Sequence, residues 1–263
     1  MSSTNRTKIA LITGGTRGIG RAIADKLAPD HHLIIVGSSD STHDTAAELN
    51  AQGHSAQGLA LDLADTGAIA AVVQELRVER SAVQTPHQQD QHTPSQPQQD
   101  HHPLTHLDAL VHSAGVIAHD PVTETTPDQW QHAFDVNLFA VAELTRQLLP
   151  QLRAAHGTVV AINSGAGQFS GAGFGPYAAT KFALRAYADA LREEHRNEFR
   201  VTSIHPGKVD SDMQVSIQSA RGNTYDESQF LRADSVAKAV RFAIDATDDA
   251  MVESLTIRPA NGN

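Results

Sequence analysis

The chain has 263 residues, a formal net charge of −10 and 40% hydrophobic residues. This length suits one large α/β domain with one sizeable core. The acidic balance argues against nucleic-acid binding, which needs a basic surface, and the absence of cysteine excludes disulfides, thiolate catalysis and cysteine-ligated zinc. The polar N-terminus and the lack of a run of about 18 apolar residues indicate neither a signal peptide nor a membrane span. We therefore expect a soluble cytoplasmic protein.

Apolar runs of strand length alternate with helical patterns along the chain. Strands are predicted within seven segments, 8–15, 32–39, 55–65, 107–116, 157–167, 199–207 and 253–259. Helices are predicted over 18–28, 44–53, 66–79, 127–154, 177–197 and 234–246. Continuous apolar strands that alternate with helices are typical of a parallel sheet covered on both faces. The sequence predicts an α/β fold of Rossmann type: a doubly wound, mostly parallel seven-stranded sheet in a single domain over 1–263.

Residues 80–106 interrupt this alternation. They are rich in Gln, His and Pro and have almost no apolar content, so they cannot bury enough surface to offset the entropy lost on ordering. We predict a disordered surface insertion. The alternative is a metal site made from the histidines of this segment, His87, His92, His101, His102 and His106. No carboxylate or cysteine framework fixes a ligand geometry there, so we expect no metal.

The first predicted strand runs into the loop "TGGTRGIGRAIA". Gly14, Gly18 and Gly20 are spaced Gly-x3-Gly-x-Gly in this loop. Glycines let the backbone turn tightly and approach a pyrophosphate, whose charge the N-terminus of the next helix stabilises. Because the loop joins a strand to a helix, it predicts a dinucleotide site rather than a plain glycine turn.

The end of the second predicted strand indicates which dinucleotide binds. An NAD enzyme typically has a carboxylate about 20 residues after the glycine loop. Here Gly37, Ser38 and Ser39 occupy that place, and Asp40 follows later. Two hydroxyls would not repel a 2′-phosphate, and Arg17 in the loop could pair with it through two N–H donors. We predict NADP, with NAD as the alternative cofactor and a solvated loop arginine as the alternative role for Arg17.

A tyrosine and a lysine stand four residues apart in "PYAATKFAL". This spacing places Tyr177 and Lys181 on one face of a helix, one turn apart. Together with the upstream glycine loop, the pair makes the chain resemble the short-chain dehydrogenase/reductase family. The resemblance covers nearly the whole chain and is interrupted at 80–106. It depends on the order and separation of the two motifs, since neither is specific alone.

The resemblance implies an oxidoreductase that transfers a hydride between NADP(H) and a carbonyl or alcohol substrate, in the manner of a carbonyl reductase. Tyr177 would be the proton donor or acceptor, and Lys181 together with the nicotinamide cation would lower its pKa. Ser164, 13 residues before the tyrosine, would donate a hydrogen bond to the substrate oxygen. Asn137 would hold a water that connects Lys181 to solvent.

The resemblance also implies the residues that line the cofactor. Asp62 and Leu63 would contact adenine, while Pro206 and Gly207 would flank the nicotinamide. The "HSAG" segment replaces the family's Asn-Asn-Ala-Gly, which weakens one backbone-stabilising feature. The full implied set is Gly14, Thr16, Arg17, Gly18, Ile19, Gly20, Ser38, Ser39, Asp62, Leu63, Ser113, Ala114, Gly115, Asn137, Tyr177, Lys181, Pro206, Gly207, Val209 and Ser211.

We expect the substrate pocket over the carboxyl ends of the strands. Its expected walls are 116–121, 165–176 and a short lid at 211–232, and an apolar or aromatic ketone, aldehyde or diketone is the expected substrate. His119 and His205 could touch it, although structural roles are the simpler explanation. The resemblance implies a homodimer or homotetramer through 127–154 and 177–197. Two alternatives remain open, a cofactor-binding regulator without catalysis and the related epimerase/dehydratase group.

Overall fold

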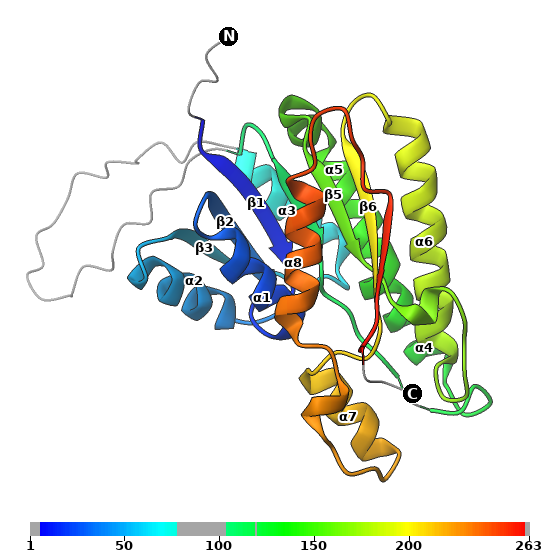
Figure 1. Cartoon of the computed structure of the whole chain (residues 1–263). Coiled ribbons are helices and arrows are strands. Elements are labelled where there is room, and N and C mark those ends of the chain that lie inside the picture. The colour runs from blue at the N-terminus through cyan, green and yellow to red at the C-terminus, as the bar shows by residue number, and fades with distance from the viewer. Residues whose placement is uncertain (1–5, 78–103, 119, 261–263) are drawn as a thin grey trace, which may run out of the picture.

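The computed structural model describes residues 6–77, 104–118 and 120–260. Within these residues, seven strands form one sheet in the order β3-β2-β1-β4-β5-β6-β7, and every neighbouring pair is parallel. The strands are β1 (Lys8–Thr13), β2 (His31–Gly37), β3 (Ser55–Ala60), β4 (Ala109–His112), β5 (Thr158–Ile162), β6 (Arg200–Pro206) and β7 (Ser254–Ile257). The predicted Rossmann-type doubly wound sheet is confirmed (Figure 1).

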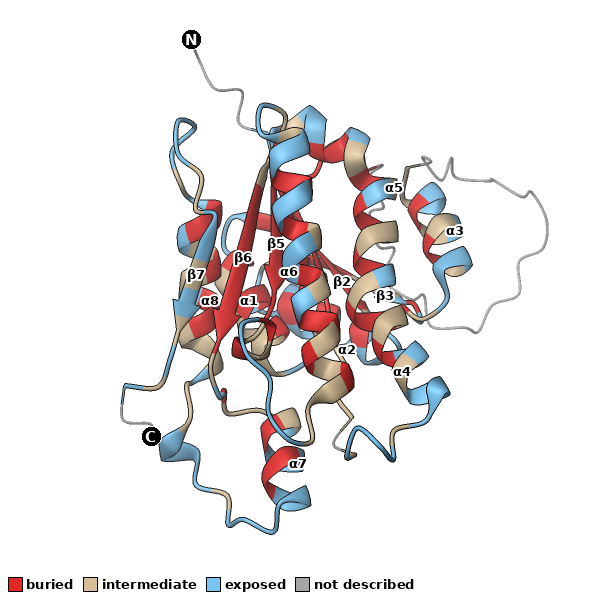
Figure 2. Ribbon diagram, turned by 90° about the vertical axis from the view of Figure 1, so that its right-hand side faces the viewer, coloured by how far each residue is buried: buried red, intermediate tan, exposed pale blue. Residues whose placement is uncertain are grey.

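Helices cover both faces of this sheet. The longer ones are α1 (Gly18–Leu27), α2 (Ser41–Ala51), α3 (Thr66–Arg77), α4 (Pro127–Phe134), α5 (Ala140–Ala155), α6 (Gly175–His195), α7 (Asp212–Ala220) and α8 (Ala233–Ile244). Shorter turns are the π-helical η1 (Asp135–Phe139) and the 3-10 turns η2 (Gly165–Gly167) and η3 (Glu227–Gln229). Apolar residues of α1, α2 and α8 pack on one face of the sheet, and those of α3, α5 and α6 pack on the other. Figure 2 shows the buried strands between these two layers.

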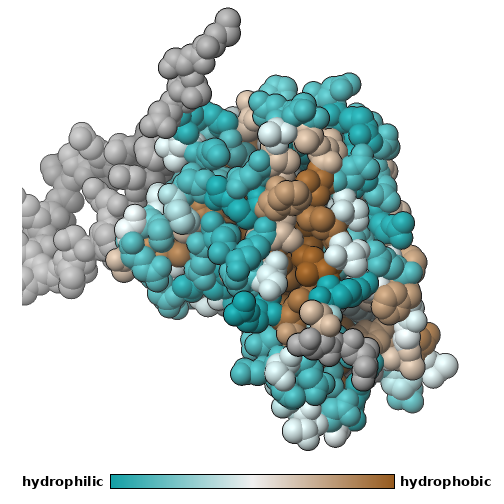
Figure 3. All heavy atoms as spheres, in the orientation of Figure 1, coloured by the Kyte–Doolittle hydropathy of each residue, from teal (hydrophilic) through white to brown (hydrophobic). Residues whose placement is uncertain are grey.

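The central strands are apolar at consecutive positions because both of their faces are buried. In β1, Ile12 packs in the cluster that contains Ile23 of α1, while Leu11 packs in the cluster that contains Leu144 of α5. This is the pattern expected for a parallel sheet between two helical layers. The edge strand β7 instead alternates between exposed and half-buried residues. An apolar strip is visible beside α8 and β7 (Figure 3), and Phe242 of α8 is 62% exposed.

The strand order reverses between β1 and β4. Thr13, the last residue of β1, pairs with His112, the last residue of β4. The chain leaves β1 toward β2 on one side of this point and continues from β4 toward β5 on the other. Ligands of doubly wound sheets bind in the crevice at the carboxyl ends of the strands where the order reverses. The glycine loop and the "HSAG" segment both emerge at this crevice.

The structure differs from the sequence predictions in three segments. The predicted helix 127–154 contains the π turn η1, and the predicted lid 211–232 contains the helix α7. Leu104, expected to be disordered, is 3% exposed, and its N–H donates to Leu76 O at 2.7 Å. Residues 80–103 of the predicted insertion, with His87, His92, His101 and His102, lie outside the described residues. His106 is described, and its Nε2 lies 3.0 Å from Thr7 O. Among the described residues, no group of three or more metal-ligating side chains could hold an ion.

Candidate cofactor and catalytic site

The glycine loop packs directly against the backbone that follows β4. Gly14 and Gly18 have φ values of +67° and +53°, a region that favours glycine. A Cβ on Gly14 would lie 2.8 Å from Ala114 Cα, and a Cβ on Gly20 would lie 2.1 Å from Gly14 O. Backbone therefore packs directly against backbone at both glycines. A larger residue at Gly14 would push the loop away from the segment after β4, and one at Gly20 would push α1 away from the loop.

The loop opens α1 in a way that suits an anion. Arg17 is the N-cap residue and makes no side-chain cap hydrogen bond, and the first turn contains no acidic residue. The N–H groups of a helix's first turn lack partners within the helix and carry a partial positive charge. A Cβ on Gly18 would lie 3.8 Å from Ser211 Cβ, so the start of α7 borders the same space. These features fit a dinucleotide pyrophosphate.

Two serines, rather than a carboxylate, follow Gly37 at the end of β2, and the exposed Asp40 comes after them. Ser38 and Ser39 are exposed there, and Ser39 Oγ lies 2.9 Å from Ser41 Oγ. The side chain of Arg17 is 80% exposed and reaches Asp212 at 3.5 Å. This end of the sheet therefore presents hydroxyls and an accessible guanidinium.

The residues predicted to contact adenine lie after β3. Asp62 is exposed, and its Oδ1 accepts a hydrogen bond from Ala64 N at 2.9 Å. Leu63 is 7% exposed and packs in the core. The side chain of Leu63 therefore supports the sheet, and only Asp62 presents its polar group outward.

Asn137 lies within the π turn between α4 and α5. Its Oδ1 accepts from Val116 N at 2.9 Å, and its Nδ2 donates to Val116 O at 2.9 Å and to Thr180 Oγ1 at 3.1 Å. The side chain is 1% exposed. The amide thus ties η1 to the segment after β4 and to α6. A π turn inserts one extra residue into a helix and is frequent at functional sites.

Ser164 follows β5 and is fixed through its backbone. Its N–H donates to Asn163 Oδ1 at 2.9 Å, and its carbonyl accepts from His205 Nδ1 at 3.2 Å. Its Oγ accepts from Ala166 N at 3.1 Å and also hydrogen-bonds the hydroxyl of Tyr177. Sequence reasoning missed Asn163, whose only signal is a polar residue at the end of a buried strand.

Lys181 lies beside Tyr177, and burial shifts the pKa of both side chains. The ammonium of Lys181 is 5.7 Å from the centroid of the Tyr177 ring and donates to Ile162 O at 2.9 Å. Burial lowers the pKa of Lys181 from 10.5 to about 8. Burial also raises the pKa of Tyr177, and the hydrogen bond from Ser164 opposes this shift. The lowering of the tyrosine pKa by Lys181 and the nicotinamide cation stays a prediction for the protein with its cofactor bound.

The four predicted catalytic residues are connected by contacts that begin at Gly115. A Cβ at this glycine would lie 3.2 Å from Asn137 Oδ1 and 3.9 Å from Lys181 Nζ. Lys181 in turn adjoins Tyr177, which bonds Ser164. The four side chains come from η1, the segment after β5 and α6, and they meet beside the crevice between β1 and β4.

The "HSAG" segment gains partners that the sequence did not reveal. His112 is 3% exposed, and its Nε2 pairs with Thr145 Oγ1 at 2.9 Å. Thr13 Oγ1 accepts from Ser113 N at 3.1 Å and from Ala114 N at 3.2 Å. Burial, followed by the charge of Lys181, lowers the pKa of His112 to about 3, so this imidazole is neutral. These bonds hold the segment where we expected a weakened backbone.

The segment after β6 returns to the same crevice. Pro206 ends β6, and Gly207 N donates to Ile257 O at 2.7 Å. Val209 is buried and bridges to Leu231, and Ser211 Oγ caps α7 by accepting from Gln214 N at 3.3 Å. The predicted contact residues of this segment therefore lie on a path from β6 to the glycine loop. His119, predicted as a possible substrate contact, lies outside the described residues.

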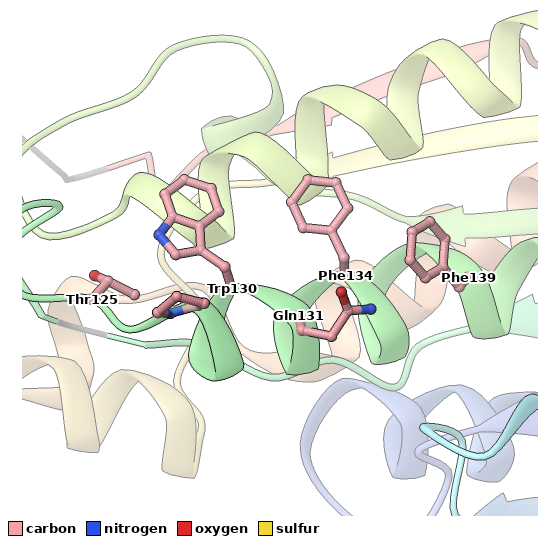
Figure 4. Close-up of a pocket in the computed structure, with 6 residues that line it drawn as sticks. Thr125, Trp130, Gln131, Phe134 and Phe139 are labelled. Carbon is pink, nitrogen blue, oxygen red and sulfur yellow. The ribbon is translucent and has the colours of Figure 1, made fainter.

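A shallow hollow of about 500 Å³ lies elsewhere, on the outer side of α4 and η1. Its lining residues are Thr125, Pro127, Trp130, Gln131, Phe134 and Phe139. Figure 4 shows the three aromatic rings on the same side of this helical segment. None of Ser164, Tyr177 and Lys181 lines it, so the hollow is separate from the candidate site.

The reversed strand order and the glycine loop at the point of reversal define a dinucleotide-binding protein of the Rossmann class. The family model for short chain dehydrogenase matches residues 8–85 and 82–222. The chain therefore belongs to the short chain dehydrogenase family. No helix in the described part of the chain combines the length and apolarity needed to cross a membrane.

Individual relatives agree with this assignment. Dehydrogenase/reductase SDR family member 7B of Bos taurus is 30% identical over 230 residues, which are 84% of this chain and 63% of that protein. The chain thus spans less than two thirds of that relative. The 3-oxoacyl-[acyl-carrier-protein] reductase FabG of Escherichia coli is 28% identical over 78% of this chain and 75% of its own. A short chain dehydrogenase from Burkholderia cenocepacia in complex with NADP superposes with a TM-score of 0.74 at 26% identity, covering 98% of each chain.

Proposed function

We propose that the protein is an NADP(H)-dependent oxidoreductase that reduces a carbonyl group, with Tyr177 as the proton donor. The observation that carries this proposal is the convergence of Asn137, Ser164, Tyr177 and Lys181 beside the glycine crevice. Each residue alone has a structural explanation. Their connection through direct contacts, at the position where the sheet's order reverses, supports a single chemical role.

Carbonyl reduction needs a hydride on carbon and a proton on oxygen. The nicotinamide cofactor, when bound, supplies the hydride. Burial raises the pKa of Tyr177, so the phenol remains protonated near neutral pH and can donate its proton to the substrate oxygen. Ser164 Oγ lies within hydrogen-bond reach of the same hydroxyl and would donate to that oxygen as negative charge develops.

Lys181 would restore the proton of Tyr177. Its pKa of about 8 is close to neutrality, which suits an ammonium that exchanges protons. Asn137, one contact away across Gly115, uses its amide to hold the Val116 backbone and Thr180. We propose that this arrangement fixes the wall along which a water connects Lys181 to solvent.

The cofactor preference follows from the end of β2. Ser38 and Ser39 offer hydroxyls, and Arg17 offers an exposed guanidinium that can bind a 2′-phosphate through two N–H groups. The Burkholderia cenocepacia relative, which was solved with NADP, supports the same choice. The expected cofactor-contact set is the one that the sequence predicted, apart from the side chain of Leu63.

Apolar side chains around the site favour an apolar or aromatic carbonyl compound. Phe169 and Phe174 come from the loop between Ser164 and Tyr177, and Phe169 is 63% exposed. Val215 of α7 is 44% exposed on the other side. These residues would cover the body of a substrate whose carbonyl lies at Tyr177.

The test is NADPH and NADH oxidation against a panel of ketones, aldehydes and diketones, with wild type and Tyr177→Phe. We expect turnover with NADPH in the wild type and none in the variant, with the Kd for NADPH nearly unchanged in the variant. Phe242→Tyr is the control, because Phe242 lies on α8, outside the site, and is 62% exposed. Turnover by Tyr177→Phe at the wild-type rate would refute the role of Tyr177. NADPH binding without turnover of any carbonyl would instead indicate a cofactor-binding regulator.

We also propose that the protein self-associates through the outer surface of α4, η1 and α6. Phe139 is 44% exposed beside the aromatic hollow, and Phe182 of α6 is 43% exposed. Apolar side chains of this size are seldom left together in water. Light scattering should give a dimer or tetramer for the wild type and a smaller species for Phe139→Glu, and a monomeric wild type would refute this proposal.

A further inference from the structure

The helix α7 connects the two ends of the candidate site. It begins after Ser211, which borders Gly18 of the glycine loop. It ends before Arg221, whose guanidinium carbon lies 4.8 Å from the centroid of the Phe174 ring. Figure 1 shows α7 below the carboxyl ends of the strands, apart from the layers that cover the sheet. The end of α7 is thus joined to the loop that carries Phe174.

Phe174 places this guanidinium close to the proposed proton donor. The centroid of its ring is 6.5 Å from that of Tyr177. Arg221 therefore lies two ring contacts from the phenol, on the side of the site that α7 borders. A substrate with its carbonyl at Tyr177 would extend toward this arginine.

The N–H groups of Arg221 are available to a ligand. Within the described part of the chain, its guanidinium contacts the Phe174 ring and forms no hydrogen bond or ion pair. Arg258, which lies over Phe169 in a similar way, instead donates to Pro206 O at 3.4 Å and to Gln168 Oε1 at 3.2 Å. A guanidinium stacked on a ring keeps its N–H edge free for a carboxylate, which it can bind through two parallel hydrogen bonds.

We propose that Arg221 binds a carboxylate group of the substrate, so that the preferred substrates are carbonyl compounds with an apolar or aromatic body and a carboxylate at the far end. This inference rests on the proposed carbonyl reduction and specifies its substrate class. Asp226 and Glu227 follow closely in the chain, and the protein carries a net charge of −10. These negative charges would repel a polyanionic partner more strongly than a small molecule with one carboxylate.

Two aldehydes matched in ring and carbonyl test this proposal. 4-Carboxybenzaldehyde carries a carboxylate, and methyl 4-formylbenzoate carries the neutral ester. Relative to wild type, Arg221→Met should lower kcat/KM for the acid by about 10-fold or more and change the value for the ester by less than about 2-fold, because one charge-assisted contact is lost. The kcat/KM of Arg221→Lys for the acid should lie between those of wild type and Arg221→Met, since lysine keeps the charge without the planar pair of donors.

A matched control removes an arginine far from the site. Arg146 lies on α5, is 65% exposed and pairs with Glu143, and Arg146→Met should leave the ratio of the two kcat/KM values unchanged. An equal loss on acid and ester in Arg221→Met would overturn the proposal, because it would indicate a general effect on the site. Wild-type kcat/KM values for both acid and ester in Arg221→Met would overturn it as well.

A binding measurement separates this proposal from the proposed function. Isothermal titration calorimetry with 4-(hydroxymethyl)benzoate, the alcohol that corresponds to the acid probe, requires no turnover. A Kd about 10-fold weaker in Arg221→Met than in wild type supports the carboxylate site, and equal Kd values refute it. Failure of every carbonyl in the turnover assay would refute the carbonyl reduction and leave this comparison of Kd values to decide the role of Arg221.

Discussion

Replacing Lys181 by methionine is expected to stabilise the folded protein at pH 7 while removing its turnover. The ammonium is 4% exposed, and burial lowers its pKa from 10.5 to about 8. At pH 7 Lys181 is protonated in both the folded and the unfolded chain, so the folded state bears the whole free-energy cost of burying the charge. A shift of this size corresponds to about 3 kcal/mol. Methionine has a similar length and no charge to bury.

The net gain is smaller because Lys181 also donates to Ile162 O at 2.9 Å. Leaving that buried carbonyl without its donor costs about 1–2 kcal/mol. We therefore expect Lys181→Met to be more stable than wild type by about 1–2 kcal/mol at pH 7. Lys238→Met is the control: Lys238 is 62% exposed beside Asp234, and its loss should change stability by less than about 0.5 kcal/mol.

The pH dependence tests the cause of this gain. Between about pH 8 and 10.5 the unfolded chain binds the lysine proton and the folded chain does not, so the wild type gains stability as the pH rises. The advantage of Lys181→Met should therefore shrink by about 2 kcal/mol between pH 7 and pH 9.5. Urea unfolding at both pH values measures it. A difference between wild type and variant that does not change with pH would refute the reasoning, as would a variant less stable than wild type at pH 7.

Three further predictions concern other parts of the site. Burial lowers the pKa of His112 from 6.5 to about 3, so below pH 6.5 the unfolded chain binds a proton that the folded chain does not. Between pH 7 and pH 5 the free energy of unfolding of the wild type, measured in urea, should therefore fall by about 2 kcal/mol more than that of His112→Asn. Equal losses would contradict this. Gly20→Ala should destabilise the folded protein by about 2 kcal/mol or more, because its Cβ would lie 2.1 Å from a carbonyl oxygen. Gly53→Ala, which has open space and a φ of +87°, should cost about 1 kcal/mol. Equal effects in thermal unfolding would rule out the steric clash at Gly20 as the cause. Arg17→Met should weaken the calorimetric Kd for NADPH by about 10-fold and leave that for NADH unchanged, and an equal change for both would remove Arg17 from the 2′-phosphate site.

The fold was predictable because its signals are local. β1, β2 and β5 are runs of consecutive apolar residues, and such runs between helices specify a parallel sheet covered on both faces. The glycine loop was predictable for the same reason, since its spacing and its place after a strand need no distant contact. The helix α7 was missed because its polar sequence, from Asp212 to Ala220, has only a weak apolar stripe.

The site was only partly predictable because its energetics depend on distant contacts. The sequence places Tyr177 and Lys181 on one helical face, but it does not show that Lys181 donates to Ile162 O, 19 residues away in the chain. The direction of the tyrosine pKa shift depends on burial by surrounding elements and cannot be inferred from a spacing of four. Likewise, the bond between His112 and Thr145 joins residues from different elements, so "HSAG" suggested a weakness that the fold removes.

The π turn at Asp135–Phe139 also constrains which insertions and deletions the chain can tolerate. Deleting one residue there would convert the turn to a regular α-helix, whose hydrogen bonds are better formed. Successive residues of an α-helix are separated by about 100° around the axis, so the deletion would turn Asn137 away from Val116 or rotate all of α5 against the sheet. A regular helix would thus need one residue fewer at this point, whereas the position of Asn137 requires the extra residue. A deletion variant that folds but loses turnover would show that the extra residue is kept for the position of one amide.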